Sequence, residues 1–236
     1  MAGYFFAYLA ILSLINWPER PILITHPMKH IVFFTALLLA SAGLRAQDSF
    51  QFVFLNSKPD KEELPQAQVD SLMELHFANM GRLAEAGHLL VAGPFYGGGG
   101  IFVFGTDEQV TDSLVQTDPA VQANRWHIEQ FTWRPHEGGI CVAPEDYEMT
   151  TYSVLRFYAT DQSPTEAQVQ EQLTYLKTLE GTILTLGTFD DGAAGVMLVF
   201  DGEPNDALAE ASPGVMGGWY TGKAMQLYIA EGSFCE

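Results

Sequence analysis

The sequence predicts an α+β fold made of two tandem ferredoxin-like βαββαβ units that pack against each other as a pseudo-dimer within one chain. Segments whose apolar residues alternate, as in strands, and segments whose apolar residues recur every three or four positions, as in helices, follow each other in the order βαββαβ. This order occurs twice along the chain. Landmark residues of the two halves recur at one fixed offset. The strands carry apolar residues on both sides, so each sheet must be covered on both faces.

The first unit begins with an alternating, β-rich segment at 50–57, which predicts a strand. A helix is predicted over 64–86, where His76 shares one face with apolar residues. Gly87 ends this helix, as glycine commonly does just beyond the last helical residue. The remaining predicted elements are a strand at 88–95, a turn at 96–100, a strand at 101–105, a short helix at 106–114 and a strand at 125–133.

The second unit repeats this order after a break in the pattern. An offset of 94 aligns several landmarks, whereas the apolar stripes of the long helices require an offset of 93 or 100. The chain therefore reads as a tandem of two diverged copies. The predicted elements are strands at 151–159, 182–189, 194–200 and 223–231, with helices at 164–179 and 203–211. The aligned landmarks are Gly87 with Gly181, Gly93 with Gly187, Phe95 with Phe189, and Asp118-Pro119 with Ser212-Pro213.

The predicted domains are 47–134 and 149–236, joined by a linker at 135–148. The linker stretch is rich in proline and glycine and has no hydrophobic period. Each sheet covers one face with its own helices, so packing the two sheets face to face would cover the other.

Residues 1–46 are predicted to be a leader. Met28-Lys29-His30 supplies a basic start, an apolar run follows at 31–39, and small residues precede a cut after Ala46 or, as the second choice, Ala42. The apolar run is shorter than the roughly 20 residues that a membrane span needs. We expect a periplasmic or secreted protein with no stable membrane insertion once the signal is removed.

A second apolar stretch lies further upstream, at 4–15. One explanation is that the true start is Met28. The alternative is a genuine membrane anchor ahead of the signal-like segment.

The net charge of the chain is −18, and Glu19 is the only acidic residue before residue 47. The region after the leader is therefore strongly acidic. Such a surface repels nucleic acid and anionic lipid, so we exclude both as partners. Hydrophobic residues make up 47% of the chain, which is too many for a disordered acidic segment.

The chain has two cysteines, Cys141 and Cys235, each a few residues beyond the last strand of its half. Two thiolates are too few for a structural metal site. In an oxidising compartment they can pair. Because spacing alone does not fix the distance between them, a Cys141–Cys235 disulfide and two free thiols both remain open.

The first unit resembles the YCII-related family over about 50–133. The resemblance rests on His76 in the first helix, on the segment LAEAGHLLVAGPF at 83–95 and on TDPAVQANRW at 117–126. It implies a fold like that of dimeric α+β barrels and a cleft whose active pair would be His76 and Asp118. Some relatives are linked to dechlorination or isomerisation of small aromatic compounds. The second unit is similar only in the order and spacing of its predicted strands and helices, since it contains no histidine and has Ser212 in place of the aspartate.

The residues themselves leave two interpretations for each member of this pair. His76 is either a core histidine with one hydrogen bond or a general acid–base group, because an ordinary imidazole titrates near neutral pH. Asp118 either caps a short helix that begins at Pro119 or orients His76. Ser212 would cap equally well, so capping alone does not explain why only the first unit has a carboxylate.

Two functions follow from these interpretations. The first is an enzyme of lyase or isomerase type that binds a small organic ligand and moves a proton with His76, steered by Asp118. The second is a non-catalytic periplasmic binding or structural module. No cofactor and no metal are expected, because the glycines at 97–100 are not followed by Gly-Lys-Ser/Thr and no histidine–glutamate spacing suits a metal.

Overall fold

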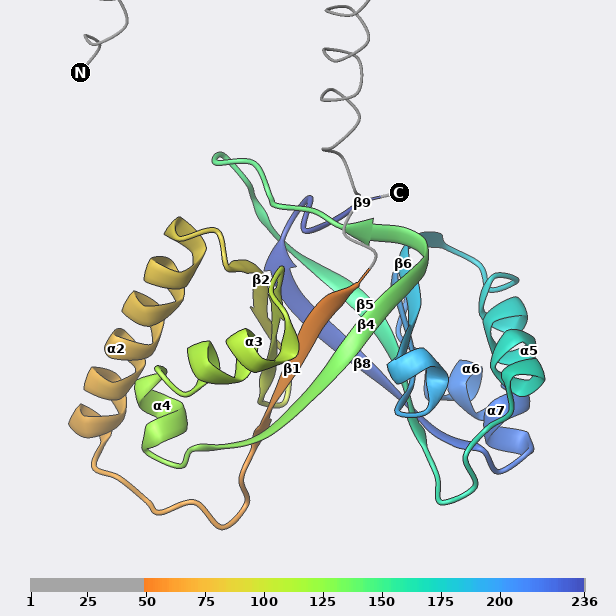
Figure 1. The fold of residues 1–236 in the computed structure, drawn as a ribbon, viewed down its shortest axis with the longest axis horizontal. Coiled ribbons are helices and arrows are strands. Elements are labelled where there is room, and N and C mark those ends of the chain that lie inside the picture. Colours follow the sequence, from red (N-terminus) through yellow and green to blue (C-terminus); the bar gives the residue numbers. More distant parts are fainter. Residues whose placement is uncertain (1–48, 236) are drawn as a thin grey trace, which may run out of the picture. The chain divides into compact units, whose positions relative to one another are not determined.

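The structure is a computed structural model that describes residues 49–235, so the predicted leader lies outside the described residues. The described residues form one compact α+β unit. Its centre is a nine-stranded antiparallel sheet, with one group of helices on each side (Figure 1). The predicted α+β class is confirmed.

The first half places its strands in the spatial order β2-β3-β1-β4. Gly87 lies just beyond α2 in the left-handed region, at φ +73°, as expected of a glycine that ends a helix. Asp107 caps α3 by accepting a hydrogen bond from the Val110 N–H at 2.8 Å. The elements of this half are β1 (Phe50–Ser57), α2 (Gln66–Glu85), β2 (Leu89–Pro94), β3 (Gly100–Phe104), α3 (Glu108–Val115), α4 (Pro119–Gln122) and β4 (Trp126–Ile140).

The second half has the strand order β6-β7-β5-β8, which is the same connectivity. Its long helix begins with a capping box between Thr165 and Gln168. The elements are β5 (Met149–Ala159), α5 (Glu166–Leu176), β6 (Thr182–Phe189), the 3₁₀ turn η1 (Asp190–Gly192), β7 (Gly195–Asp201), α6 (Asp206–Glu210), α7 (Pro213–Met216), β8 (Tyr220–Ala230) and β9 (Phe234–Cys235).

The two halves join edge to edge at both ends of their strand orders. Strand β4 pairs with β6 from Trp133 opposite Phe189 onward, so one sheet runs through both halves. At the opposite end Phe95 bridges Leu227, and the Tyr96 N–H donates to the Gln226 carbonyl at 3.0 Å. The sheet therefore curls until its two ends meet, rather than forming two separate layers.

The segment expected to be a linker begins as strand. Strand β4 continues to Ile140 because β6 and then β9 offer it hydrogen-bonding partners. The pairing register shifts between Pro135 and Glu137, and Gly138 has φ +61°. A side chain at Gly138 would collide with the Leu184 carbonyl, so glycine is required at this bend. Only the part after Ile140 lies outside a strand.

The inner face of the curled sheet encloses an apolar core to which both halves contribute. Trp133 and Phe189 lie 4.7 Å apart between ring centroids, and Phe52 lies 5.2 Å from Trp133 and 5.6 Å from Phe189. Each such ring buries some 150–250 Å² and dominates the local packing energy. Each half also has a core of its own, which lies between the sheet and the helices of that half.

Arg156 on β5 is fully buried among the aromatic side chains of this inner core. Its guanidinium carbon lies 3.9 Å from the ring centroid of Phe189, 4.6 Å from that of Tyr158 and 5.0 Å from that of Phe54. Burial lowers its pKa to about 10, so the side chain is still a cation at neutral pH. Among the described residues, no carboxylate forms a salt bridge with Arg156. The faces of the aromatic rings stabilise its positive charge instead.

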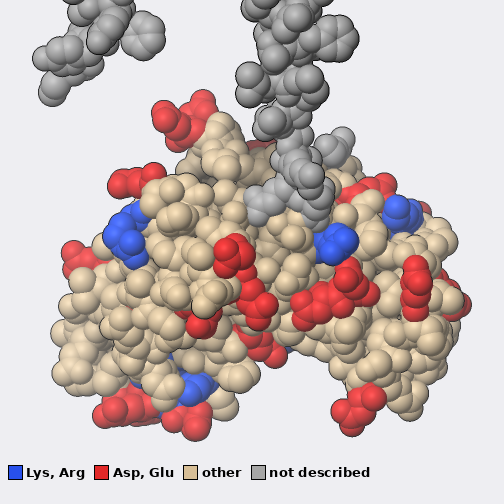
Figure 2. Space-filling view, in the orientation of Figure 1, with Lys and Arg blue, Asp and Glu red and all other residues tan. Residues whose placement is uncertain are grey.

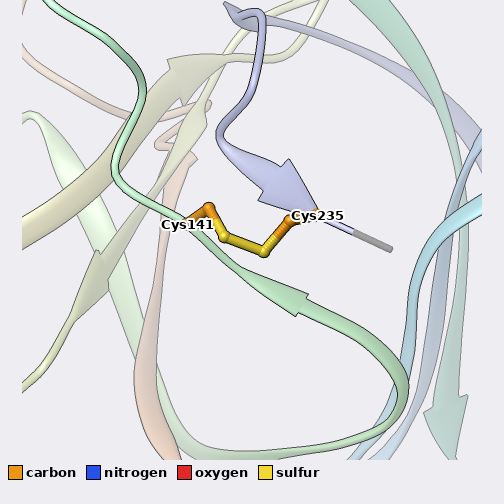
Figure 3. Close-up of a disulfide and its surroundings, with 2 residues drawn as sticks. All are labelled: Cys141 and Cys235. Carbon is orange, nitrogen blue, oxygen red and sulfur yellow. A yellow bond between two sulfur atoms is a disulfide. The ribbon is translucent and has the colours of Figure 1, made fainter.

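Cys141 and Cys235 form the disulfide that the sequence left open, with a Cα–Cα distance of 5.8 Å (Figure 3). The bond fastens the segment that leaves β4 to the C-terminal strand β9. Within residues 49–235, no helix combines the length and apolar character needed to cross a membrane.

Candidate functional site

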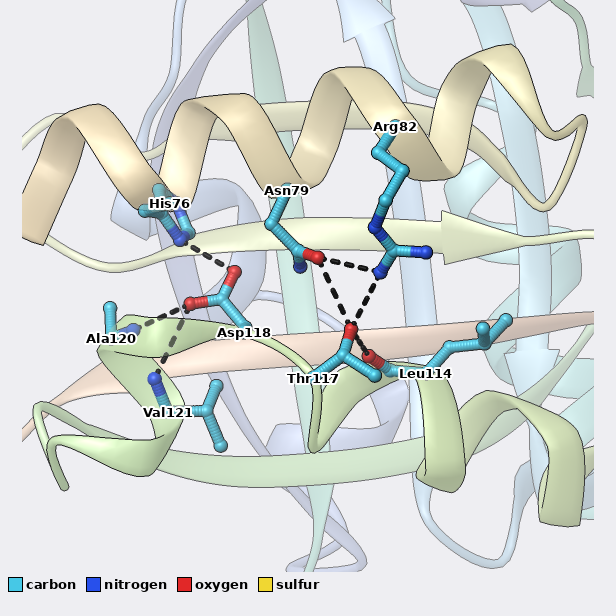
Figure 4. Close-up of polar contacts among 8 residues, drawn as sticks. All are labelled: His76, Asn79, Arg82, Leu114, Thr117, Asp118, Ala120 and Val121. Carbon is cyan, nitrogen blue, oxygen red and sulfur yellow. Dashed lines mark hydrogen bonds and ion pairs between the residues drawn. The ribbon is translucent and has the colours of Figure 1, made fainter.

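His76 and Asp118 lie together between α2 and α4. His76 is on the inner stripe of α2 and is 5% exposed, and Asp118 is the fully buried N-cap residue of α4. The His76 Nδ1 and the Asp118 Oδ2 are 2.7 Å apart (Figure 4). The structure thus brings the two predicted site residues into direct contact, while their role in binding or catalysis stays a prediction.

Asp118 serves both of the purposes that the sequence allowed. Its Oδ1 accepts hydrogen bonds from the Ala120 N–H at 2.8 Å and the Val121 N–H at 3.4 Å, which caps α4. Its other oxygen faces His76. One carboxylate therefore fixes the start of a helix and the orientation of an imidazole, so movement of α4 would misplace the ring.

The protonation states follow from these contacts. Burial on its own raises the pKa of Asp118, but the hydrogen bond and charge of His76 and the two backbone N–H groups outweigh it and hold the pKa below its usual value. At neutral pH the carboxylate is ionised and only accepts. The Nδ1 of His76 must then carry the hydrogen, which leaves the lone pair of the neutral ring on Nε2.

His76 also lines a cavity of about 430 Å³, which we call the His76 cavity. Phe102 of β3 lies beside the imidazole, with 5.8 Å between centroids and 22° between planes. Since Asp118 occupies the Nδ1 side of the ring, Nε2 is the nitrogen available to a molecule in this cavity. The remaining walls are mainly apolar and come from Met73, Phe77 and Met80 of α2, the glycines at 93, 99 and 100, and a far wall of Tyr147, Met149, Tyr228 and Ala230.

The far wall was not predicted from the sequence. Tyr147 and Met149 belong to the end of the predicted linker and the start of β5, and Tyr228 belongs to β8, about 150 residues from His76. Tyr96, in the turn that precedes β3, packs against Tyr228 with 6.4 Å between ring centroids. The sequence feature that comes nearest to indicating this wall is the presence of Tyr147 and Met149 at the end of the proline- and glycine-rich stretch.

A second polar cluster lies one turn further along α2. The Arg82 Nη2 donates to Asn79 Oδ1 at 2.7 Å and to Thr117 Oγ1 at 2.9 Å, and Thr117 donates to the Leu114 carbonyl at 2.6 Å (Figure 4). These bonds tie α2 to the residue before Asp118. Arg82 therefore links α2 to the segment that leads into α4.

The second half has a different arrangement at the corresponding point. Ser212 caps α7, with its Oγ accepting from the Val215 N–H at 3.4 Å. Gln172 reaches across from α5, and its Oε1 accepts from the Gly214 N–H at 2.9 Å. Both side chains are neutral, so the helix–cap contact is kept here without an imidazole or a carboxylate.

The described residues contain no group of three or more His, Cys, Asp or Glu side chains that could hold a metal ion. On the face shown in Figure 2, acidic side chains outnumber basic ones, in keeping with the net charge of −18. Among the described residues, no Lys, Arg, Asp or Glu lines the His76 cavity.

No protein-family model matches the chain, and no curated protein matches it in sequence. Among solved structures, the chain is similar to a crystal structure from Fusobacterium nucleatum subsp. nucleatum, of a protein named "Putative monooxygenase". The two are 11% identical, the match covers 80% of this chain and 96% of that one, and the TM-score is 0.40. The resemblance to the YCII-related family is thus not shown by any match.

Proposed function

We propose that this protein binds a small, neutral, mainly apolar organic molecule in the His76 cavity and transfers a proton through His76. The observation that carries the proposal is that Asp118 holds Nδ1 at 2.7 Å while the same ring lines an apolar cavity of about 430 Å³. Ligand pockets of this size are typically apolar and contain a few well-placed polar groups.

The chemistry requires only the side chains at the site. The Nε2 lone pair accepts a proton from an acidic C–H or O–H of the ligand, and the adjacent carboxylate stabilises the imidazolium that forms. Return of that proton to a different carbon gives an isomerisation. In an elimination, the electron pair of the broken C–H bond forms a new C=C double bond, and a leaving group on the neighbouring carbon departs with the electron pair of its own bond. The proton stays on His76 until solvent removes it.

Binding without turnover is the second candidate function. It is favoured by the small number of reactive groups, since His76 and two tyrosines are the only titratable residues among those of 49–235 that line the cavity. In that case the imidazole orients a ligand by one hydrogen bond and transfers no proton.

We also propose the ancestry and location that fit this function. The identical connectivity of β2-β3-β1-β4 and β6-β7-β5-β8 supports two diverged ferredoxin-like copies of YCII-related type, arranged as an intrachain pseudo-dimer. The Cys141–Cys235 bond supports an oxidising compartment, the periplasm or the extracellular medium, because disulfides are rare in the cytosol.

The test of binding uses the neutral aromatic fluorophore N-phenyl-1-naphthylamine. We expect saturable fluorescence enhancement that Ala92→Phe abolishes, because Ala92 lines the cavity. Ala86→Phe, at the exposed end of α2 and outside the cavity lining, is the matched control and should bind normally. No enhancement with the unmodified protein, or equal binding by Ala92→Phe, would refute the binding site.

The test of proton transfer uses 4-nitrophenol, whose absorbance moves to longer wavelength as its hydroxyl gives up the proton. We expect this shift on binding, and we expect His76→Phe to remove the shift while fluorophore binding persists. Binding of 4-nitrophenol with the spectrum of the neutral phenol in both proteins would leave only the second candidate function.

A further inference from the structure

A second hollow of about 430 Å³, which we call the outer hollow, lies next to the His76 cavity. Five residues line both spaces: Phe77, Met80, Ala92, Tyr147 and Ala230. The two volumes therefore adjoin each other along α2, and we call them together the channel.

Both parts of the channel have the same chemical character. The outer hollow is lined largely by small and apolar residues, among them Ala84, Leu90 and Val142. Neither part is lined by Lys, Arg, Asp or Glu among the described residues, so a charged group would find no partner there. His76 lines only the His76 cavity, and Ser233 lines only the outer hollow.

The segment after β4 forms the outer wall of the channel. Val142, Ala143 and Tyr147 lie in it, and 71% of Val142 and 51% of Tyr147 are exposed. The segment belongs to no strand or helix and is held at its two ends. One end is fixed by the Cys141–Cys235 bond and by the Cys141 N–H donating to the Ser233 carbonyl at 2.9 Å. At the other end the Glu231 N–H donates to the Glu148 carbonyl at 2.8 Å.

We propose that the ligand is an elongated neutral amphiphile, with a hydroxyl or similar polar head at His76 and an apolar tail in the outer hollow. The disulfide-bound segment is the wall that selects the tail. This inference rests on the proposed function, because it takes the His76 cavity as the place where the head binds.

The experiment measures displacement of N-phenyl-1-naphthylamine by phenol and by 4-alkylphenols with tails of one to seven carbons. Each buried CH₂ contributes about 0.8 kcal/mol, which corresponds to roughly fourfold tighter binding per carbon. We expect this gain to continue until the tail fills the outer hollow.

Ala84 lines the outer hollow and not the His76 cavity, so Ala84→Trp places a large side chain in the outer hollow. It should leave the affinity for phenol unchanged and remove the gain for long tails. Glu85→Trp is the matched control, because Glu85 is the exposed neighbour on the same helix and does not line the channel. It should retain the full gain.

The outcomes separate this inference from the proposed function. If phenol binds and the alkyl tails bring no gain, or if Ala84→Trp retains the gain, the elongated ligand is refuted while the binding site stands. If the fluorophore and phenol both fail to bind, the proposed function itself fails. Opening the disulfide by Cys141→Ser should weaken the long-tailed phenols at least tenfold and leave phenol within about twofold, because Val142 and Ala143, which follow Cys141 directly, line the outer hollow and not the His76 cavity. Equal weakening of phenol and the long-tailed phenols would refute a role for the segment in selecting the tail.

Discussion

Replacing Asp118 by serine separates the contact with His76 from the helix cap. Serine is the residue that the second half has at the corresponding cap, so Asp118→Ser keeps a cap on α4 and removes only the carboxylate. The lost interaction is a charge-assisted hydrogen bond of 2.7 Å, buried on both sides. Bonds of that kind contribute about 1.5–3 kcal/mol, and the stranded Nδ1–H adds to the loss.

We therefore expect Asp118→Ser to lower the free energy of unfolding by about 2–3 kcal/mol at pH 7, measured by urea denaturation with the disulfide intact. Ser212→Ala is the internal control. It removes a cap that has no histidine partner and should cost about 1 kcal/mol. A loss below about 0.5 kcal/mol for Asp118→Ser, with an unchanged denaturant slope, would show that the contact with His76 contributes nothing to stability.

Three further predictions follow from other features. The pKa of Asp118 is held below its usual value of 3.8. The difference in stability between the wild type and Asp118→Ser should therefore be present in full above that pH and vanish as the pH falls through the lowered pKa. A difference in stability that persists in strong acid would contradict this prediction. Reducing the Cys141–Cys235 bond, whose cysteines are 94 residues apart, should cost about 4–5 kcal/mol in the chain-entropy model, and urea unfolding of the oxidised and reduced protein compares the two. Intact-mass analysis of exported material should show a chain that begins at Gln47, and material that still contains residues 1–27 would overturn the predicted signal peptide.

Much of the secondary structure could be predicted because its causes are local, whereas the pairing of His76 with Asp118 was implied by the resemblance to the YCII-related family. Segment 50–57 alternates in polarity and is a strand over that range, and Gly87 ends α2. Asp118 followed by Pro119 is a helix start by composition alone. A histidine on the buried stripe of a long helix needs a partner, and the capping carboxylate provides one.

Other features depend on contacts distant in the sequence and left no local signal. The extension of β4 to Ile140 depends on pairing with β6 and β9, so its proline and glycine residues suggested a linker. Arg156 would be read as a surface residue of β5, yet rings from both halves surround it. The far wall of the His76 cavity joins Tyr147 and Tyr228 to a helix that precedes them by some 70 and 150 residues, and no spacing rule connects such positions.

Nitrogen-15 NMR of the His76 ring tests the central claim most directly, because it reports the proton on each nitrogen and the surroundings of Nε2. At a pH where the ring is neutral, the account predicts that Nδ1 carries the hydrogen and that Nε2 does not. It also predicts that saturating 4-propylphenol moves the Nε2 resonance strongly, as a hydroxyl donates to it, while Nδ1 remains bonded to Asp118. A ring with its hydrogen on Nε2, or an Nε2 resonance that saturating phenol leaves unmoved, would contradict a ligand site at His76.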